Sequence, residues 1–158
     1  MTQRLKDASL GDIAKEIQDC YPHTGDMVFH KDANPNNWIV ANQDITAIDW
    51  EDHGLMYQHF DLVKLIEQSH THDDKDRERI IKQYMRSYGV KDKHEFTRAY
   101  QNAVIPTAIS FALHSYDRGF GTDDERAFFL DNAARAAGKL HRPHLVQSLE
   151  RVKQLTTS

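Results

Sequence analysis

The segment that decides the fold is "VFHKDANPNNWIV", residues 28–40, in which a polar stretch separates two short apolar runs. The polar stretch contains His30, Asp32 and Asn37, spaced as H-x-D-x-x-x-x-N. A second segment, "ITAIDWEDHG" at residues 45–54, begins with another apolar run and leads into acidic residues. Short apolar runs bounded by turn-forming residues are typical of β-strands joined by tight turns.

The apolar runs on either side of Asn42–Asp44 predict a β-hairpin. We expect its strands at residues 38–41 and 45–48. Asp49 directly follows the second strand, so the hairpin would return it to the side of Asn37. An amide and a carboxylate are therefore expected together at the base of the hairpin.

The spacing of the three polar residues is that of a kinase catalytic loop, in which the Asp accepts a hydroxyl proton and the Asn binds a metal. A loop of this length can bring a carboxylate and an amide oxygen into one small volume. Mg²⁺ prefers oxygen ligands and usually takes one or two carboxylates together with phosphate oxygens. The pattern thus marks Asp32 as a candidate base and Asn37 and Asp49 as candidate metal ligands. The triplet alone recurs by chance in roughly 2% of such chains, so the second segment carries much of the argument.

The rest of the chain is predicted to be helical, because apolar residues recur at helical spacing after Gly54. Pro106 and Pro143 mark expected helix boundaries, and Thr122 with Glu125 forms an expected capping box. The expected helices cover residues 9–20, 58–69, about 80–88 (stopped by Gly89), 96–103 (ending before Pro106), 109–116, 122–140 and the segment beyond Pro143. We therefore predict a mainly α fold, a helical bundle with one small hairpin, in a single domain of residues 1–158.

Composition excludes several classes of protein. The chain has 158 residues, of which 39% are hydrophobic and 28% charged, and its net charge is -4. This balance is that of an ordinary globular protein and does not favour nucleic acid or an anionic membrane as a partner. Cys20 is the only cysteine, so no disulfide forms within the chain and a cytoplasmic location is expected. No apolar run approaches the roughly 20 residues of a membrane span.

The two segments together resemble a known family. "HKDANPNNWIV" followed by "ITAIDWEDHGLMYQHFDLVKLI" is similar to the aminoglycoside phosphotransferase and choline kinase-like superfamily. Within it, the "NNW" triplet most resembles small phosphotransferases of Gram-positive bacteria. The resemblance implies the helical C-terminal lobe of a protein-kinase-like fold. It also implies that Asp32 is the catalytic base, that Asn37 and Asp49 bind Mg²⁺, and that Asp61 braces the backbone of the catalytic loop.

Other positions carry weaker implications. By the resemblance, His30 packs against the loop and supports it through hydrogen bonds rather than moving protons. Glu51 and Asp52 either face a cationic acceptor or are solvated, and the sequence leaves both interpretations open. The family pattern has glycines where this chain has Lys31 and Asn36. Asn tolerates left-handed backbone angles, so we expect the turn at Asn36 to survive.

The resemblance implies ATP-dependent phosphoryl transfer to a hydroxyl of a small molecule. The acceptor classes left open are a sugar, a nucleoside, a choline-like molecule and an aminoglycoside, and ATP is not distinguished from GTP. The residues before Met27 contain neither a Gly-rich loop nor a strand with a phosphate-pairing Lys. We therefore expect weak nucleotide binding by this chain alone, and a nucleotide-binding N-terminal lobe supplied in cis or by a second chain. The alternative is a non-catalytic binding or regulatory lobe.

Overall fold

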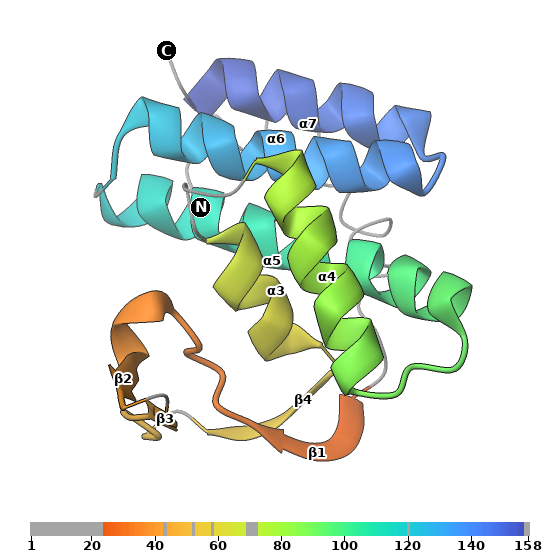
Figure 1. Ribbon diagram of the computed structural model, residues 1–158. Coiled ribbons are helices and arrows are strands. Elements are labelled where there is room, and N and C mark those ends of the chain that lie inside the picture. Colours follow the sequence, from red (N-terminus) through yellow and green to blue (C-terminus); the bar gives the residue numbers. More distant parts are fainter. Residues whose placement is uncertain are drawn as a thin grey trace. The chain divides into compact units, whose positions relative to one another are not determined.

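The computed structural model describes residues 24–42, 44–51, 53–57, 59–68, 73–119 and 121–156 (Figure 1). These residues are mainly helical and also contain two small antiparallel sheets, which confirms the predicted fold class. The elements are β1 (Thr24–Phe29), η1 (Pro35–Asn37), β2 (Trp38–Ala41), β3 (Asp44–Ala47), β4 (Gly54–Tyr57), α3 (Phe60–Glu67), α4 (Asp74–Ser87), α5 (Lys93–Arg118), α6 (Asp123–Lys139) and α7 (Pro143–Thr156). The expected helix at residues 9–20 lies outside the described residues, as do Cys20 and Asp52.

Two compact units make up the chain, one of residues 23–100 and one that includes residues 101–158. The candidate site residues all belong to the first unit. Each unit is described by itself.

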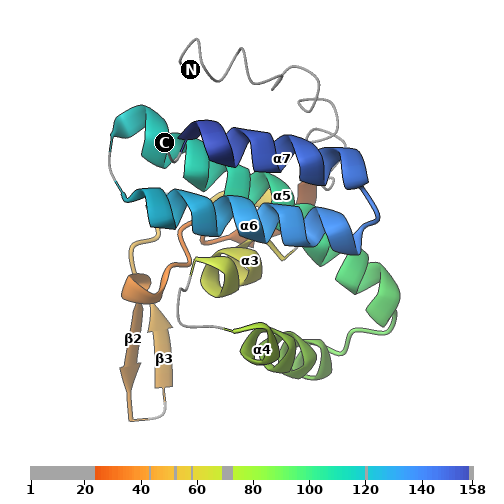
Figure 2. The same cartoon turned by 90° about the horizontal axis from the view of Figure 1, so that it is seen from above.

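The predicted hairpin is present. Strands β2 and β3 pair antiparallel, from Trp38 opposite Ala47 at the base to Ala41 opposite Asp44 at the tip (Figure 2). Asn42 opens the turn with a φ of 51°, a left-handed angle that Asn adopts more readily than most residues. The hairpin begins its return one residue earlier than expected, at Asp44.

A second sheet corrects the prediction that the chain becomes helical directly after Gly54. Residues 54–57 form strand β4, which pairs antiparallel with β1 and places Phe29 opposite Gly54. This pairing joins residues distant in sequence, so the local pattern of apolar residues does not reveal it. The sheet brings together the strand that precedes His30 and the strand that leads into α3.

The helices of the first unit bury a mixed set of side chains. In α3, Val63 and Ile66 are fully buried, and the charged Lys64 and Glu67 are buried beside them. Helix α4 ends as predicted at Gly89, whose φ of 70° is the left-handed conformation of a helix C-terminus. The terminal carbonyls of α4 are satisfied there, since Val90 N–H donates to Met85 O at 3.0 Å.

Helix α5 corrects a second prediction, because it runs unbroken through Pro106. A proline inside a helix removes a hydrogen bond and costs about 3 kcal/mol. Thr107 Oγ1 donates to Ala103 O at 2.8 Å and so holds the turn that contains the proline. The burial of apolar side chains on both sides of the proline offsets its cost. These side chains are Ala103, Val104, Ile105, Ala108 and Ile109.

In the second unit, α6 and α7 pack side by side (Figure 2). The predicted capping box is present: Glu125 N donates to Thr122 Oγ1 at 3.1 Å, and Thr122 N donates to Glu125 Oε2 at 2.7 Å. The apolar face predicted beyond Pro143 is buried at Leu145, Leu149 and Val152. Within the described ranges, no helix is both long and apolar enough to cross a membrane.

Candidate active site

Residues 30–37, which we call the 30–37 loop, connect β1 to the hairpin. His30, at the start of the loop, is only 2% exposed. Its Nε2 lies 2.6 Å from Ile48 O, and its Nδ1 accepts a hydrogen bond from Asp32 N at 3.3 Å. These contacts fix the tautomer, with the proton on Nε2, because Nδ1 must accept. Both ring nitrogens are therefore engaged in contacts with backbone groups of the site.

Asp61, in the first turn of α3, holds the start of the loop. Its Oδ2 accepts a hydrogen bond from His30 N at 2.8 Å, and its Oδ1 accepts one from Lys31 N at 2.9 Å. These are the backbone contacts that the sequence led us to expect of Asp61. One carboxylate thus satisfies two successive backbone N–H groups at the start of the loop.

The carboxylate of Asp32 is held by three donors, one from α3 and two from the 30–37 loop itself. Lys64 Nζ donates to Oδ1 at 2.8 Å. The side-chain amides of Asn34 and Asn37 donate to Oδ2 at 3.0 Å and 2.9 Å. The hydrogen bond from Lys64 is the largest cause that lowers the pKa of Asp32 below its ordinary value; partial burial opposes it, and the two amides act in the same direction as Lys64. Because its pKa is lowered, the Asp32 side chain is ionised at neutral pH. It is also open to solvent, since 38% of it is exposed.

Asn37 closes the loop and is buried. Its amide nitrogen donates to both Asp32 O and Asp32 Oδ2, each at 2.9 Å. The same residue accepts Ile48 N–H at its backbone oxygen, at 2.9 Å, which ties the end of the loop to the far strand of the hairpin. Because the amide nitrogen faces Asp32, the side-chain oxygen is left as an acceptor for another group.

Asp49 directly follows Ile48, so it flanks the base of the hairpin as predicted. Its side chain is exposed, and its φ is 63°. Glu51 is exposed two residues further on. Within the described ranges, no group of three His, Cys, Asp or Glu side chains is arranged to hold a metal ion. A cation at this place would need the amide oxygen of Asn37 as well as the carboxylate of Asp49.

Lys31 and Asn36 are the two loop residues that stand where the family pattern has glycine. Lys31, which stands where the family pattern has glycine, adopts a φ of 66°. Its ammonium lies 3.3 Å from the position that a Cβ on Gly54 would occupy. At Asn36 the expected turn is present as the short helix η1, and it needs no left-handed angle at that residue. The left-handed angle within the loop falls at Lys31.

Sequence reasoning missed two residues of the site. Asn34 caps η1, since its side-chain oxygen accepts Asn36 N at 2.9 Å, and the Asn-Pro pair at residues 34–35 is a recognisable signal for such a cap. Lys64 lies on a helix whose neighbouring residues are buried, and its position three residues after Asp61 places both side chains on one face. A lysine inside an apolar helical pattern was the available signal.

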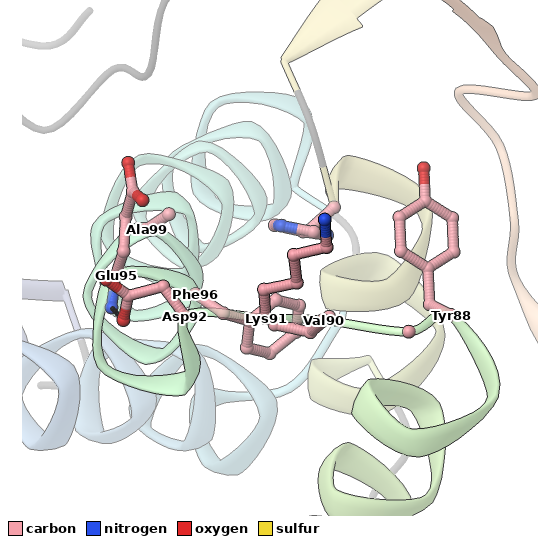
Figure 3. Close-up of a pocket in the computed structure, with 9 residues that line it drawn as sticks. Tyr88, Val90, Lys91, Asp92, Glu95, Phe96 and Ala99 are labelled. Atoms are coloured by element: carbon pink, nitrogen blue, oxygen red, sulfur yellow. Dashed lines mark hydrogen bonds between the residues drawn. The ribbon is translucent and has the colours of Figure 1, made fainter.

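A separate hollow of about 290 Å³ lies where α4 leads into α5. Figure 3 shows Lys91 between Tyr88 on one side and Asp92 and Glu95 on the other. Asp92 is already engaged, because its Oδ1 accepts hydrogen bonds from His94 N and Glu95 N at the start of α5. None of the residues that line this hollow belongs to the 30–37 loop or to the hairpin.

Comparison with protein families matches residues 2–100 to a group described as the phosphotransferase enzyme family. The matched range is more than half of the chain, and it includes the 30–37 loop, the hairpin and α3. A search of curated proteins finds no match.

Proposed function

The chain belongs to the phosphotransferase enzyme family, and we propose that it is the catalytic lobe of a kinase that transfers a phosphoryl group from ATP to a hydroxyl of a small molecule. The observation that carries this proposal is the fixed, ionised carboxylate of Asp32 beside the amide of Asn37. Phosphoryl transfer needs positioning and charge stabilisation more than covalent chemistry, and a rigid acceptor of this kind supplies positioning.

Asp32 is the proposed catalytic residue. It receives the hydrogen bond of the acceptor hydroxyl and orients its oxygen towards the phosphorus. The proton moves to the carboxylate as the new O–P bond forms and the bond between the γ-phosphorus and the β,γ-bridging oxygen breaks, so that ADP leaves with that oxygen. The lowered pKa keeps Asp32 ionised at neutral pH, so its carboxylate can accept the hydrogen bond of the hydroxyl.

Asn37 and Asp49 are the proposed ligands of Mg²⁺. The chemistry of the donor set fits a hard cation, since one amide oxygen and one exposed carboxylate are present and phosphate or water oxygens complete such sites. When bound, the ion neutralises the charge of the phosphates. The protein's own contribution is to hold Asn37 by its amide nitrogen and by its backbone, so that its oxygen stays available.

His30 is proposed as a structural support of the loop and not as a base. The support for this is its deep burial and the engagement of both ring nitrogens with backbone groups. A base must reach the proton that it removes, and this ring does not reach solvent.

The acceptor is proposed to be a sugar, a nucleoside, a choline-like molecule or an aminoglycoside. Exposed Glu51 lies close in sequence to Asp49 and favours the cationic members of this group, and Asp52 would add to the negative charge.

A second segment or chain is proposed to complete the site. Its support is the exposure of the hairpin's apolar side chains, since Val40 is 71% and Ile45 66% exposed.

Calorimetric titration of ATP into the chain, with and without Mg²⁺, tests the nucleotide site. The proposed contacts come from a few residues of one lobe, so we expect Mg²⁺-dependent binding with a Kd on the order of millimolar, about 4 kcal/mol. Asp49→Ala should abolish it. Asp44→Ala removes another exposed aspartate, at the other end of the hairpin, and should leave the binding unchanged. Equal binding without Mg²⁺, or by the Asp49 variant, would contradict the proposal.

Release of ADP in the presence of the four acceptor classes tests turnover. Release that falls by about 10²-fold or more in Asp32→Asn supports the catalytic role. Mg²⁺-dependent binding without any release, on the chain together with its completing segment, would instead support the alternative of a binding or regulatory lobe.

A further inference from the structure

Lys64 makes two contacts with the 30–37 loop that the family pattern does not account for. Its side chain is only 9% exposed, and its ammonium lies 2.8 Å from Asp32 Oδ1 and 2.7 Å from Lys31 O. A buried ammonium is costly unless it is paired and hydrogen-bonded. The contacts with Asp32 and Lys31 supply that pairing at the side chain proposed to receive the substrate.

We propose that Lys64 is a positioning residue of the transfer reaction, which fixes the carboxylate of Asp32 in the orientation that receives the acceptor hydroxyl. This inference rests on the proposed function. It assigns to α3 a second task besides the support that Asp61 gives to the loop.

Asp61 and Lys64, two charged residues of α3, contact different parts of the 30–37 loop. Asp61 binds the N–H groups of His30 and Lys31, so the backbone before Asp32 is already held without Lys64. Lys64 instead reaches the side chain of Asp32 itself. Loss of Asp61 therefore disturbs the loop. Loss of Lys64 leaves the backbone held, but the carboxylate then keeps only the two amide hydrogen bonds at Oδ2, and Oδ1 is no longer fixed.

The count of hydrogen bonds indicates where the hydroxyl binds. An ionised carboxylate offers about four acceptor positions, two on each oxygen. Asn34 and Asn37 both donate to Oδ2, and Lys64 donates to Oδ1. The position left open lies on Oδ1, the oxygen that Lys64 contacts. The two amides thus leave Oδ1 to receive the acceptor hydroxyl, and Lys64 holds that oxygen in place.

The first test uses nuclear magnetic resonance on the chain and does not depend on activity. Three-bond couplings of the Asp32 side chain should show a single χ1 rotamer in the unsubstituted chain. In Lys64→Met, where only the amides at Oδ2 remain, the couplings should show a second rotamer in measurable amount. Lys64→Arg keeps a cationic donor and should retain one rotamer. Lys82→Met removes an exposed lysine of α4 and should change nothing. Averaged couplings in the unsubstituted chain would overturn the inference without any variant, and so would a single rotamer in folded Lys64→Met.

The second test separates kcat from KM in the complete kinase. Misplacement of a reacting group by about 1 Å costs on the order of 100-fold in rate. Lys64→Met should therefore lower kcat by up to about that factor, while KM for ATP stays unchanged because Asn37 and Asp49 are untouched; Lys64→Arg should recover most of the loss. An unchanged kcat in Lys64→Met overturns the inference. Absence of nucleotide binding and turnover in the unsubstituted protein would refute the proposed function instead, and the couplings would still decide whether Lys64 holds Asp32.

Discussion

The carboxylate of Asp61 accepts the backbone N–H of His30 at 2.8 Å, across 31 positions of the sequence. Asp61→Ala leaves this donor and that of Lys31 without a partner, and such loss costs about 1–3 kcal/mol. We expect urea unfolding to show that loss. Glu150→Ala, an exposed change on α7, should stay within about 0.5 kcal/mol. An unchanged stability of the Asp61 variant would contradict the bracing role.

A buried ion pair joins α3 and α4. Glu67 is 3% exposed, lies 3.4 Å from Arg77 Nε, and accepts a hydrogen bond from the Tyr100 hydroxyl at 2.8 Å. Glu67→Ala leaves a buried guanidinium with less compensation, so we expect a loss of about 3–5 kcal/mol. Tyr100→Phe removes only the hydrogen bond and should cost about 1–3 kcal/mol. Equal losses in the two variants would show that the charge of Glu67 contributes nothing.

Gly121 precedes the capping box of α6 and has a φ of 77°. A Cβ there would lie 2.5 Å from Ser115 Oγ and 2.9 Å from Glu125 Oε2, so Gly121→Ala both strains the backbone and displaces the cap. Gly119→Ala is the matched control, because Gly119 has a φ of 66° and open space around it. The control should lose about 1–2 kcal/mol from strain alone. Gly121→Ala should lose about 1 kcal/mol more, and melting temperatures that fall equally would contradict the clash.

His59 makes stability sensitive to acid. Burial lowers the pKa of His59 from 6.5 to about 4, and its ring packs 4.3 Å from that of Phe96. The unfolded chain then binds a proton at a higher pH than the folded one. Stability is therefore lost as the pH falls below about 6.5, with a slope that approaches about 1.4 kcal/mol per pH unit and levels off near pH 4.

The measurement is the free energy of unfolding between pH 6.5 and pH 5, above the range in which most carboxylates titrate. His59→Asn tolerates the left-handed angle at this position and should show a shallower slope, whatever its stability at neutral pH. His94→Asn, at an exposed position of α5, should keep the slope of the unsubstituted chain. An unchanged slope of the unfolding free energy against pH in His59→Asn would show that another group causes the acid sensitivity.

Local signals in the sequence were sufficient for much of the fold. The hairpin follows from two apolar runs around Asn42, and the start of α6 follows from Thr122 and Glu125, because each depends on residues close in sequence. Strand β4 and the passage of α5 through Pro106 depend instead on distant partners and on burial. No pattern of neighbouring residues reports either, so local rules predicted a helix after Gly54 and a break at Pro106.

The candidate site also contains residues that local sequence patterns reveal and residues that depend on contacts distant in sequence. Asp32, Asn37 and Asp49 could be selected because their chemical types recur at a recognisable spacing. Lys64 could not be selected in this way, since a lysine on a helix is usually read as exposed. Its place in an apolar helical pattern was a signal of burial, but its contact with Asp32 is known only from the distance of 2.8 Å.

The placement of Asp61 and Lys64 on one face of α3 has a consequence for changes in chain length. A single residue inserted before Asp61 leaves Asp61 and Lys64 on one face of the helix, but one inserted between them turns the second side chain by about 100° away from the loop. The two insertions are equally long. Only the insertion between Asp61 and Lys64 separates the carboxylate that holds the backbone from the ammonium that holds Asp32. The described residues at the tip of the hairpin, Ala41, Asn42 and Asp44, make neither of these contacts. Natural and engineered variation in length should therefore collect at the hairpin tip and avoid the first turn of α3.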